Sequence, residues 1–155
     1  MRTLVDTPNR TIHVVALDET RIIPTSFSGH PYCCLLWDHE GRSGRDSQAA
    51  VAHDLVSSGC RYVVCGGTNC EAWHDAIDDE CITLDSSGEI VDVPLVMTTW
   101  HDGESPQEVA EFFIHCTGVE DIKFTRFLIV HVGRSASYQT LEQAVRTNAF
   151  EHDAV

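Results

Sequence analysis

With 155 residues, of which 43% are hydrophobic and 22% charged, the chain has the size and composition of one ordinary globular domain, and we expect residues 1–155 to fold as a single unit. Its 24 acidic and 10 basic residues give a formal net charge of −14, which argues against nucleic acid and anionic membranes as partners. No apolar run approaches the roughly 18 residues of a membrane span, and the polar start of the chain lacks the apolar core of a secretion signal.

The seven cysteines indicate a reducing compartment. An odd number of cysteines cannot pair completely, and Cys33 and Cys34 are neighbours in one apolar run. This arrangement is typical of buried reduced thiols and is hard to reconcile with a disulfide framework. We therefore expect a cytoplasmic protein.

The predicted elements begin with a strand over residues 11–17, because β-branched residues dominate the run TIHVVAL. A short hairpin partner at 21–25 is predicted next, within an irregular stretch that contains proline and glycine. From residue 32 on, continuous apolar runs alternate with helical stripes. We predict strands at 32–37, 61–65, 94–99 and 126–130, and helices at 47–58, from 68, from 105 and at 138–148, with a short hairpin or loop at 82–92.

Helix starts are indicated by two capping boxes, Thr68 with Glu71, and Ser105 with Glu108, the second followed directly by Pro106. Helical spacing then predicts which side chains turn toward the core. They are Val51, Ala52, Leu55 and Val56 in the first helix, Trp73, Ala76 and Ile77 in the second, Val109, Phe113 and Cys116 in the third, and Leu141, Ala144 and Val145 in the last.

Strands and helices that alternate along the chain, with strands apolar throughout, are typical of a parallel sheet covered on both faces. Right-handed crossovers then predict an α/β domain with three layers, Rossmann-like or flavodoxin-like, around a mainly parallel sheet of four to five strands. The order of the strands cannot be read from the pattern.

Polar side chains follow each of the four later strands, and in parallel sheets ligands bind beyond the carboxyl ends of the strands. Three histidines and three arginines fall at this edge of an otherwise acidic molecule, whereas the opposite edge offers few such groups. Trp37 and Trp100, each followed by an acid and a histidine, are candidates to line one cleft. As ligand-binding residues we assign Arg42, Arg45, Gly66, Gly67, Thr68, Asn69, His131 and Arg134, and as catalytic candidates His39, His101, Asp102 and Cys70.

The turn formed by residues 66–69 has two interpretations. Its glycines would let backbone amides at a helix start approach an anion, but a glycine pair is also a common tight turn after a strand. Cys70 follows in the first helical turn, where the helix dipole lowers a thiol pKa, and His74 lies four residues on. The pair is either a nucleophile with its base or a buried cysteine beside a surface histidine.

No paired zinc motif is present, so we assign no metal ligand and name no cofactor, although His39, His101 and His131 on separate strand ends leave a catalytic metal as an alternative. Cysteine redox sensing through Cys65 or Cys70 is another.

The segment VMTTWHDGESPQEVAEFF at 96–113 resembles a group of small uncharacterised bacterial α/β proteins, in which a TTWH strand end and an acid precede a capped helix. The similarity extends back through CGGTNCEAWHD at 65–75. This resemblance implies no activity and carries over no catalytic residue.

Two functions from different classes follow. The first is a cytosolic protein, with or without catalysis, that binds an anionic small molecule such as a phosphate or nucleotide at the carboxyl edge of the sheet, where arginines pair its charge and His39 or His101 carries a proton. The second is a non-catalytic interaction module, immunity-like or regulatory, whose acidic surface binds a basic protein partner.

Overall fold

The computed structural model describes residues 1–17, 27, 29–88 and 95–153 of the chain. Within these residues, four helices and six strands follow one another as β1 (Arg2–Thr7), β2 (Arg10–Leu17), β3 (Tyr32–Asp38), α1 (Arg45–Ser57), β4 (Cys60–Gly67), α2 (Cys70–Ser87), β5 (Met97–Trp100), α3 (Pro106–His115), β6 (Arg126–Val132) and α4 (Tyr138–Asp153). The expected hairpin partner at 21–25 lies outside the described residues, as do residues 89–92 of the hairpin or loop expected at 82–92 and residue 94 of the strand expected at 94–99.

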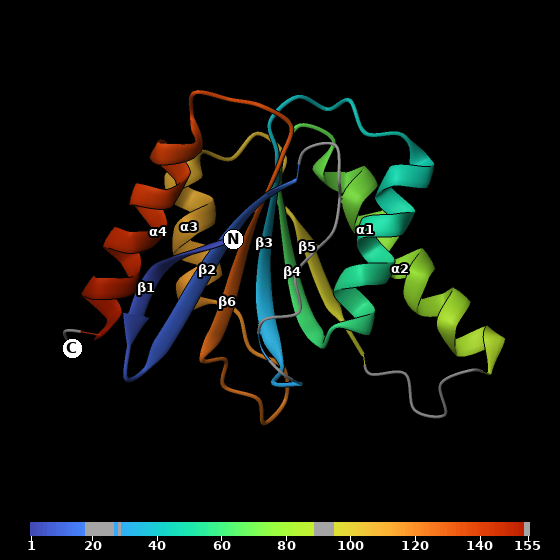
Figure 1. Cartoon of the computed structure of the whole chain (residues 1–155), viewed down its shortest axis with the longest axis horizontal. Coiled ribbons are helices and arrows are strands. Elements are labelled where there is room, and N and C mark those ends of the chain that lie inside the picture. The colour runs from blue at the N-terminus through green and yellow to red at the C-terminus, as the bar shows by residue number, and fades with distance from the viewer. Residues whose placement is uncertain (18–26, 28, 89–94, 154–155) are drawn as a thin grey trace.

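The six strands form one sheet in the order β1-β2-β6-β3-β4-β5, which is more than the four to five strands that we expected. All neighbours pair in parallel except β1 and β2, which are antiparallel. From β3 the chain moves outward to β4 and β5, and then returns through α3 to β6 on the other side of β3. β3 and β6 are neighbours in the sheet, but the chain goes from β3 to α1 on one side of the sheet and from β6 to α4 on the other (Figure 1).

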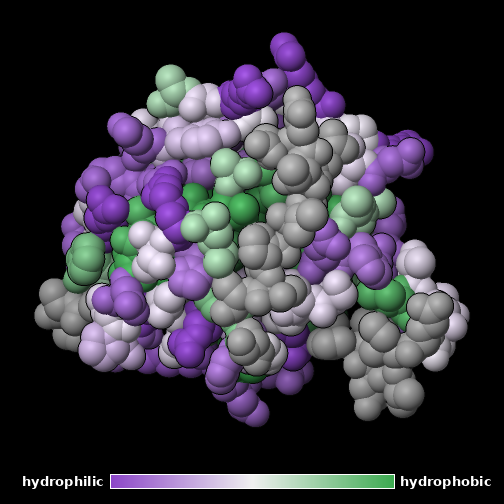
Figure 2. Space-filling view, in the orientation of Figure 1, coloured by the Kyte–Doolittle hydropathy of each residue, from purple (hydrophilic) through white to green (hydrophobic). Residues whose placement is uncertain are grey.

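Helices cover both faces of the sheet, as Figure 1 shows: α1 and α2 lie on one side, and α3 and α4 on the other. One apolar core joins α1 and α2 to alternate strand residues such as Cys34 and Leu36, and the second joins α3 and α4 to Cys33 and Leu35. Because consecutive strand residues face opposite sides, strands buried on both faces must be apolar throughout. The surface in Figure 2 is accordingly hydrophilic over the outer sides of the helices, with hydrophobic patches between them.

The structure corrects several local predictions. β1 pairs with β2 through a tight turn in which Thr7 Oγ1 accepts a hydrogen bond from the amide of Arg10, although no strand was expected there. β5 is Met97–Trp100, so the strand expected at 94–99 is confirmed over 97–99, but it is an edge strand with half-exposed side chains and the expectation of a core strand is wrong. Cys116, expected to be buried, is exposed.

The two expected capping boxes have different outcomes. Ser105 and Glu108 form theirs at the start of α3. At the start of α2 the cap is Asn69 in a left-handed conformation, and its side chain makes no capping hydrogen bond, so the box of Thr68 and Glu71 is absent. α2 also continues through the expected hairpin region to Ser87, where Gly88 ends it in the left-handed conformation typical of a helix C-cap.

Candidate functional site

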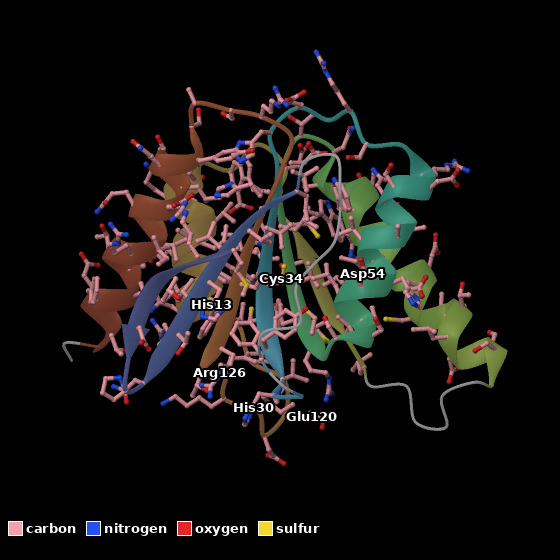
Figure 3. The ribbon with its side chains drawn as sticks, viewed as in Figure 1. His13, His30, Cys34, Asp54, Glu120 and Arg126 are labelled. Atoms are coloured by element: carbon pink, nitrogen blue, oxygen red, sulfur yellow. The ribbon has the colours of Figure 1, made fainter. Side chains whose placement is uncertain are left out.

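The loops that follow β3, β4, β5 and β6 meet at one edge of the sheet, at the top of Figure 1, and enclose a cavity of about 600 Å³. Its walls come from all four strand ends, as parallel pairing requires. We call this cavity the histidine pocket; it is lined by Trp37, Asp38, His39, Gly67, Thr68, Asn69, His101, Asp102, Gly103, Glu104, Pro106, Ser135, Ser137 and Leu141. His30, Glu120 and Arg126 lie toward the opposite end of the molecule (Figure 3).

Asp38, the last residue of β3, fixes the start of the loop that carries His39. Its buried carboxylate accepts amide hydrogen bonds from Glu40 at 3.1 Å and Gly41 at 2.8 Å through one oxygen. The other oxygen accepts the indole N–H of Trp73 at 2.8 Å. With three donors already on its carboxylate, Asp38 has a positioning role at the pocket and is not a free acid or base.

A line of hydrogen bonds runs from His39 into the protein interior. His39 Nε2 and His131 Nδ1 are 2.9 Å apart, and His131 Nε2 is 2.8 Å from a carboxylate oxygen of Glu142 in α4. The other oxygen of Glu142 forms an ion pair with the guanidinium of Arg2 in β1. We call Arg2, Glu142, His131 and His39 the histidine relay; only His39 of the four lines the histidine pocket.

The rings of the relay are held in place by Tyr138, the first residue of α4. Its ring stacks on His131 with 4.0 Å between the ring centroids and an interplanar angle of 10°, and it lies 4.7 Å from the ring of His39. The Tyr138 hydroxyl donates to the carbonyl of Gly133. Packing from α4 therefore fixes both imidazole planes.

Burial favours the uncharged form of both histidines of the relay at neutral pH. Desolvation, and secondarily the neighbouring His131, lowers the pKa of His39 to about 4. Desolvation also lowers the pKa of His131, against the opposing effect of Glu142. The short contact requires the accepting ring to be neutral, since an imidazolium has two donors and no acceptor, and a pair of neutral rings satisfies this.

His101 borders the same pocket, but both of its nitrogens are engaged. Nδ1 lies 2.8 Å from the Glu104 carboxylate and Nε2 lies 3.0 Å from Thr99 Oγ1. The ring is 7% exposed. His101 therefore shapes the pocket wall, whereas among the histidines that line the pocket His39 is the one with a nitrogen unbonded within the described residues.

The glycine turn after β4 reflects close packing between strands. A Cβ on Gly66 would lie 2.6 Å from the Trp37 ring, and one on Gly67 would lie 2.3 Å from the carbonyl oxygen of Asp38. The amide of Thr68 donates to that same carbonyl at 2.8 Å. The glycines thus bring β4 against β3, and the Thr68 amide is not available to an anion.

The predicted arginines lie apart from the histidine pocket. Arg42 and Arg134 border a second cavity of about 410 Å³, with Ser43 and Ser47 of the α1 start nearby. Glu40 lines the same cavity: its carboxylate accepts the Arg134 amide at 2.5 Å and lies 3.3 Å from Arg42 Nε. We call this cavity the arginine pocket; Arg45 is exposed and lines neither pocket.

Cys70 does not share a site with His74. The thiol is 2% exposed and desolvation raises its pKa, while His74 hydrogen-bonds Thr98 at 2.6 Å and pairs with Asp78. Trp100 stacks on His74, 4.4 Å between ring centroids, and so it does not line the pocket that contains Trp37. Among the described residues, no three His, Cys, Asp or Glu side chains are grouped as a metal site.

Two residues that sequence reasoning missed complete the relay, Glu142 and Arg2. Glu142 falls on the inward stripe of α4, directly after Leu141 and three residues before Val145. A carboxylate on an apolar stripe is an unusual signal that could have identified it. Arg2 gives no such signal, because its position depends on the pairing of β1 with β2.

Comparison with known proteins finds one family model, a domain of unknown function (DUF7684), that matches residues 12–148. No curated protein and no solved structure matches the chain. The family match confirms the expected relationship to an uncharacterised family. None of the helices in the described residues is long and apolar enough to cross a membrane.

Proposed function

The chain belongs to the DUF7684 family, whose description names no activity, and we propose its function from the site itself: it binds a small polar molecule in the histidine pocket and exchanges a proton with it through His39. The observation that carries this proposal is the contact of His39 with His131, whose other nitrogen bonds Glu142. A carboxylate that orients an imidazole, which in turn presents a base, is the arrangement that enzymes use for proton transfer.

The strand order supports this location. We propose that β5-β4-β3-β6 is a doubly wound, Rossmann-like core, in which the chain leaves β3 for one face of the sheet and leaves β6 for the other. Ligands of such folds bind in the crevice beyond the strands where the direction reverses. His39 follows β3 and His131 belongs to β6, so their contact lies at this point.

The lining predicts the charge of the ligand. Asp102 and Glu104 border the histidine pocket, and among its described lining residues there is no lysine or arginine. An anion would meet carboxylates without a compensating cation, whereas hydroxyls and ammonium groups would be favourable partners. We therefore propose a neutral or cationic ligand, rich in hydrogen-bond donors.

The anionic ligand expected from the sequence is a second candidate, and the arginine pocket is what favours it. Arg42 and Arg134 border that cavity, and the first turn of α1 begins beside it. Glu40 forms an ion pair with Arg42 and accepts the backbone amide of Arg134, so it offsets part of the charge of Arg42, and we rank this candidate second.

A thermal-shift experiment with matched probes separates the candidates: glucosamine and adenosine, each against its monophosphate. We expect the unphosphorylated probes to raise the Tm of the wild-type chain and not that of His39→Gln, with Arg134→Gln responding as wild type. Stabilisation only by the monophosphates, lost in Arg134→Gln, would overturn the proposal in favour of the second candidate. No stabilisation by any probe would overturn both and favour the acidic interaction module.

A further inference from the structure

Hydrogen-bond chemistry in the histidine relay determines which nitrogen of His39 carries a proton. We infer that Glu142, oriented by Arg2, locks both histidines as the Nε2–H tautomer and so leaves an unprotonated Nδ1 of His39 as the nitrogen available to a ligand. This inference rests on the proposed function for the role of the pocket, but the tautomer itself is a property of the chain without ligand.

The argument starts at the buried end of the relay. Glu142, paired with the Arg2 guanidinium, is a carboxylate that only accepts hydrogen bonds. His131 Nε2, 2.8 Å away, must therefore be the donor and carry the proton. His131 is fully buried and burial lowers its pKa, so it holds one proton, and its Nδ1 presents a lone pair.

The second step transfers this constraint to the pocket. The lone pair on His131 Nδ1 needs a donor, and the atom 2.9 Å away is His39 Nε2. His39 must then carry its proton on Nε2, and as a neutral ring it keeps Nδ1 unprotonated. No described residue bonds that Nδ1, and His39 lines the pocket whereas His131 does not.

The consequence is a ligand class. An unprotonated Nδ1 accepts a hydrogen bond from an O–H or N–H group and repels a carbonyl or ether oxygen placed at the same point. When the ligand gives its proton to Nδ1, the imidazolium that forms keeps its Nε2–H bond to His131, so the relay still holds the ring in place. Glu142 and Arg2 are positioning residues in this scheme, since neither lines the histidine pocket.

Glu142→Gln tests the inference because it should reverse the direction of the hydrogen bonds between Glu142, His131 and His39. Arg2 continues to donate to the side-chain oxygen, which turns the amide N–H₂ toward His131 Nε2. His131 must then accept there, carry its proton on Nδ1 and donate to His39 Nε2, so that His39 becomes the Nδ1–H tautomer. Nδ1 of His39, the nitrogen that does not contact His131, then changes from acceptor to donor.

Long-range ¹H–¹⁵N NMR of the histidine rings at neutral pH measures both tautomers directly. We expect Nε2–H for His39 and His131 in the wild-type chain, Nδ1–H for both in Glu142→Gln, and no change in Glu151→Gln, an exposed residue of the same helix. Nδ1–H at His39 in the wild-type chain would overturn the inference even if Glu142→Gln did not fold. An unchanged tautomer in folded Glu142→Gln would overturn it as well.

Fragment binding separates the inference from the proposed function. Acetamide and N,N-dimethylacetamide share an acceptor, but only acetamide has N–H donors. We expect acetamide alone to shift the His39 Nδ1 resonance in the wild-type chain. A response to neither fragment, with the tautomers as inferred, would contradict ligand binding in the pocket, whereas an equal response to both would contradict donor selection.

Discussion

The indole of Trp73 donates a hydrogen bond of 2.8 Å to the carboxylate of Asp38, and this contact joins the end of β3 to helix α2. Both side chains are almost completely buried, with exposed fractions of 1%. Because the same carboxylate also accepts the amides of Glu40 and Gly41, it fixes the backbone on both sides of His39. The position of His39 in the histidine pocket thus depends on Asp38, whose carboxylate is already occupied by three hydrogen-bond donors.

The first prediction concerns this contact. In Asp38→Asn the amide N–H₂ must face one of three donors, which leaves a buried donor unpaired and lowers the free energy of unfolding by about 2 kcal/mol. In a Trp73→Phe background the amide can face the site of the missing indole N–H, so the same substitution should cost less. Urea unfolding of the four chains measures the coupling. Asp85→Asn, at an exposed position, should stay within about 0.5 kcal/mol of wild type, and additive effects at 38 and 73 would contradict the assignment.

The second prediction concerns the close approach of β4 to β3. Gly67 has a φ of +80°, and its Cβ would lie 2.3 Å from a backbone oxygen of Asp38, which cannot move away as a side chain could. Gly67→Ala should therefore cost more than about 2 kcal/mol in unfolding free energy.

Gly103→Ala is the matched control for backbone strain, since Gly103 has a φ of +73° but a Cβ there would have no described atom within 4 Å. We expect it to cost about 1 kcal/mol. Equal losses at the two positions would mean that strain alone, and not close packing, explains Gly67.

The third prediction is a pH dependence of stability. Burial lowers the pKa of His39 to about 4 and lowers that of His131, whereas histidines of the unfolded chain titrate near 6.5. Below about pH 6.5 the unfolded chain therefore binds protons that the folded chain does not, so stability falls as the pH drops toward about 4. Above about pH 6.5 both histidines are neutral in the folded and the unfolded chain, so they add no pH dependence to the unfolding free energy.

Urea unfolding of wild type and His39→Gln between about pH 7.5 and 4.5 checks this. Acidic residues titrate in both chains, so their effect cancels in the difference in stability between the two, and the effect of His39 remains. The difference in stability between the chains should change in favour of the variant as the pH falls. A difference independent of pH would contradict the lowered pKa of His39.

The fourth prediction concerns the thiols. Cys116 is exposed and Cys81 partly buried, whereas Cys33, Cys34, Cys60, Cys65 and Cys70 are buried. Burial also raises the pKa of Cys65 and Cys70, so neither is a ready thiolate. Labelling of the folded chain with a chromogenic disulfide reagent should show one rapid thiol, which Cys116→Ser removes. Rapid labelling of Cys70, located by mass spectrometry, would restore the cysteine nucleophile and redox hypotheses.

The sequence predicted the parallel strands well because burial on both faces makes each of them apolar throughout. β3, β4 and β6 all begin or end within two residues of the predicted ranges. Elements that depend on partners were harder to predict. β1 has little apolar content, and the Ser-Ser-Gly segment that suggested a hairpin is the end of α2, since Gly88 supplies a left-handed C-cap.

The candidate site was predictable as an edge but not as a set of contacts. His39, His101 and Asp102 share one pocket because parallel strands bring their carboxyl ends together, whereas Arg42 and Arg134 border another. His39 and Arg42 follow the same strand, β3, so this division depends on the path of the loop between β3 and α1, which the sequence pattern does not contain. The bond between His39 and His131 likewise depends on β6 lying beside β3, which are far apart in the chain.

The salt bridge from Arg2 to Glu142 has a practical consequence for anyone who prepares this protein. Arg2 belongs to β1, which precedes the segment that the family model covers, so a chain trimmed to that segment would lose the guanidinium that orients Glu142. An affinity tag fused directly before Met1 would likewise lie next to Arg2, the residue of the relay that forms an ion pair with Glu142. Assays of the histidine pocket should therefore use the untrimmed chain, with any tag placed after Val155.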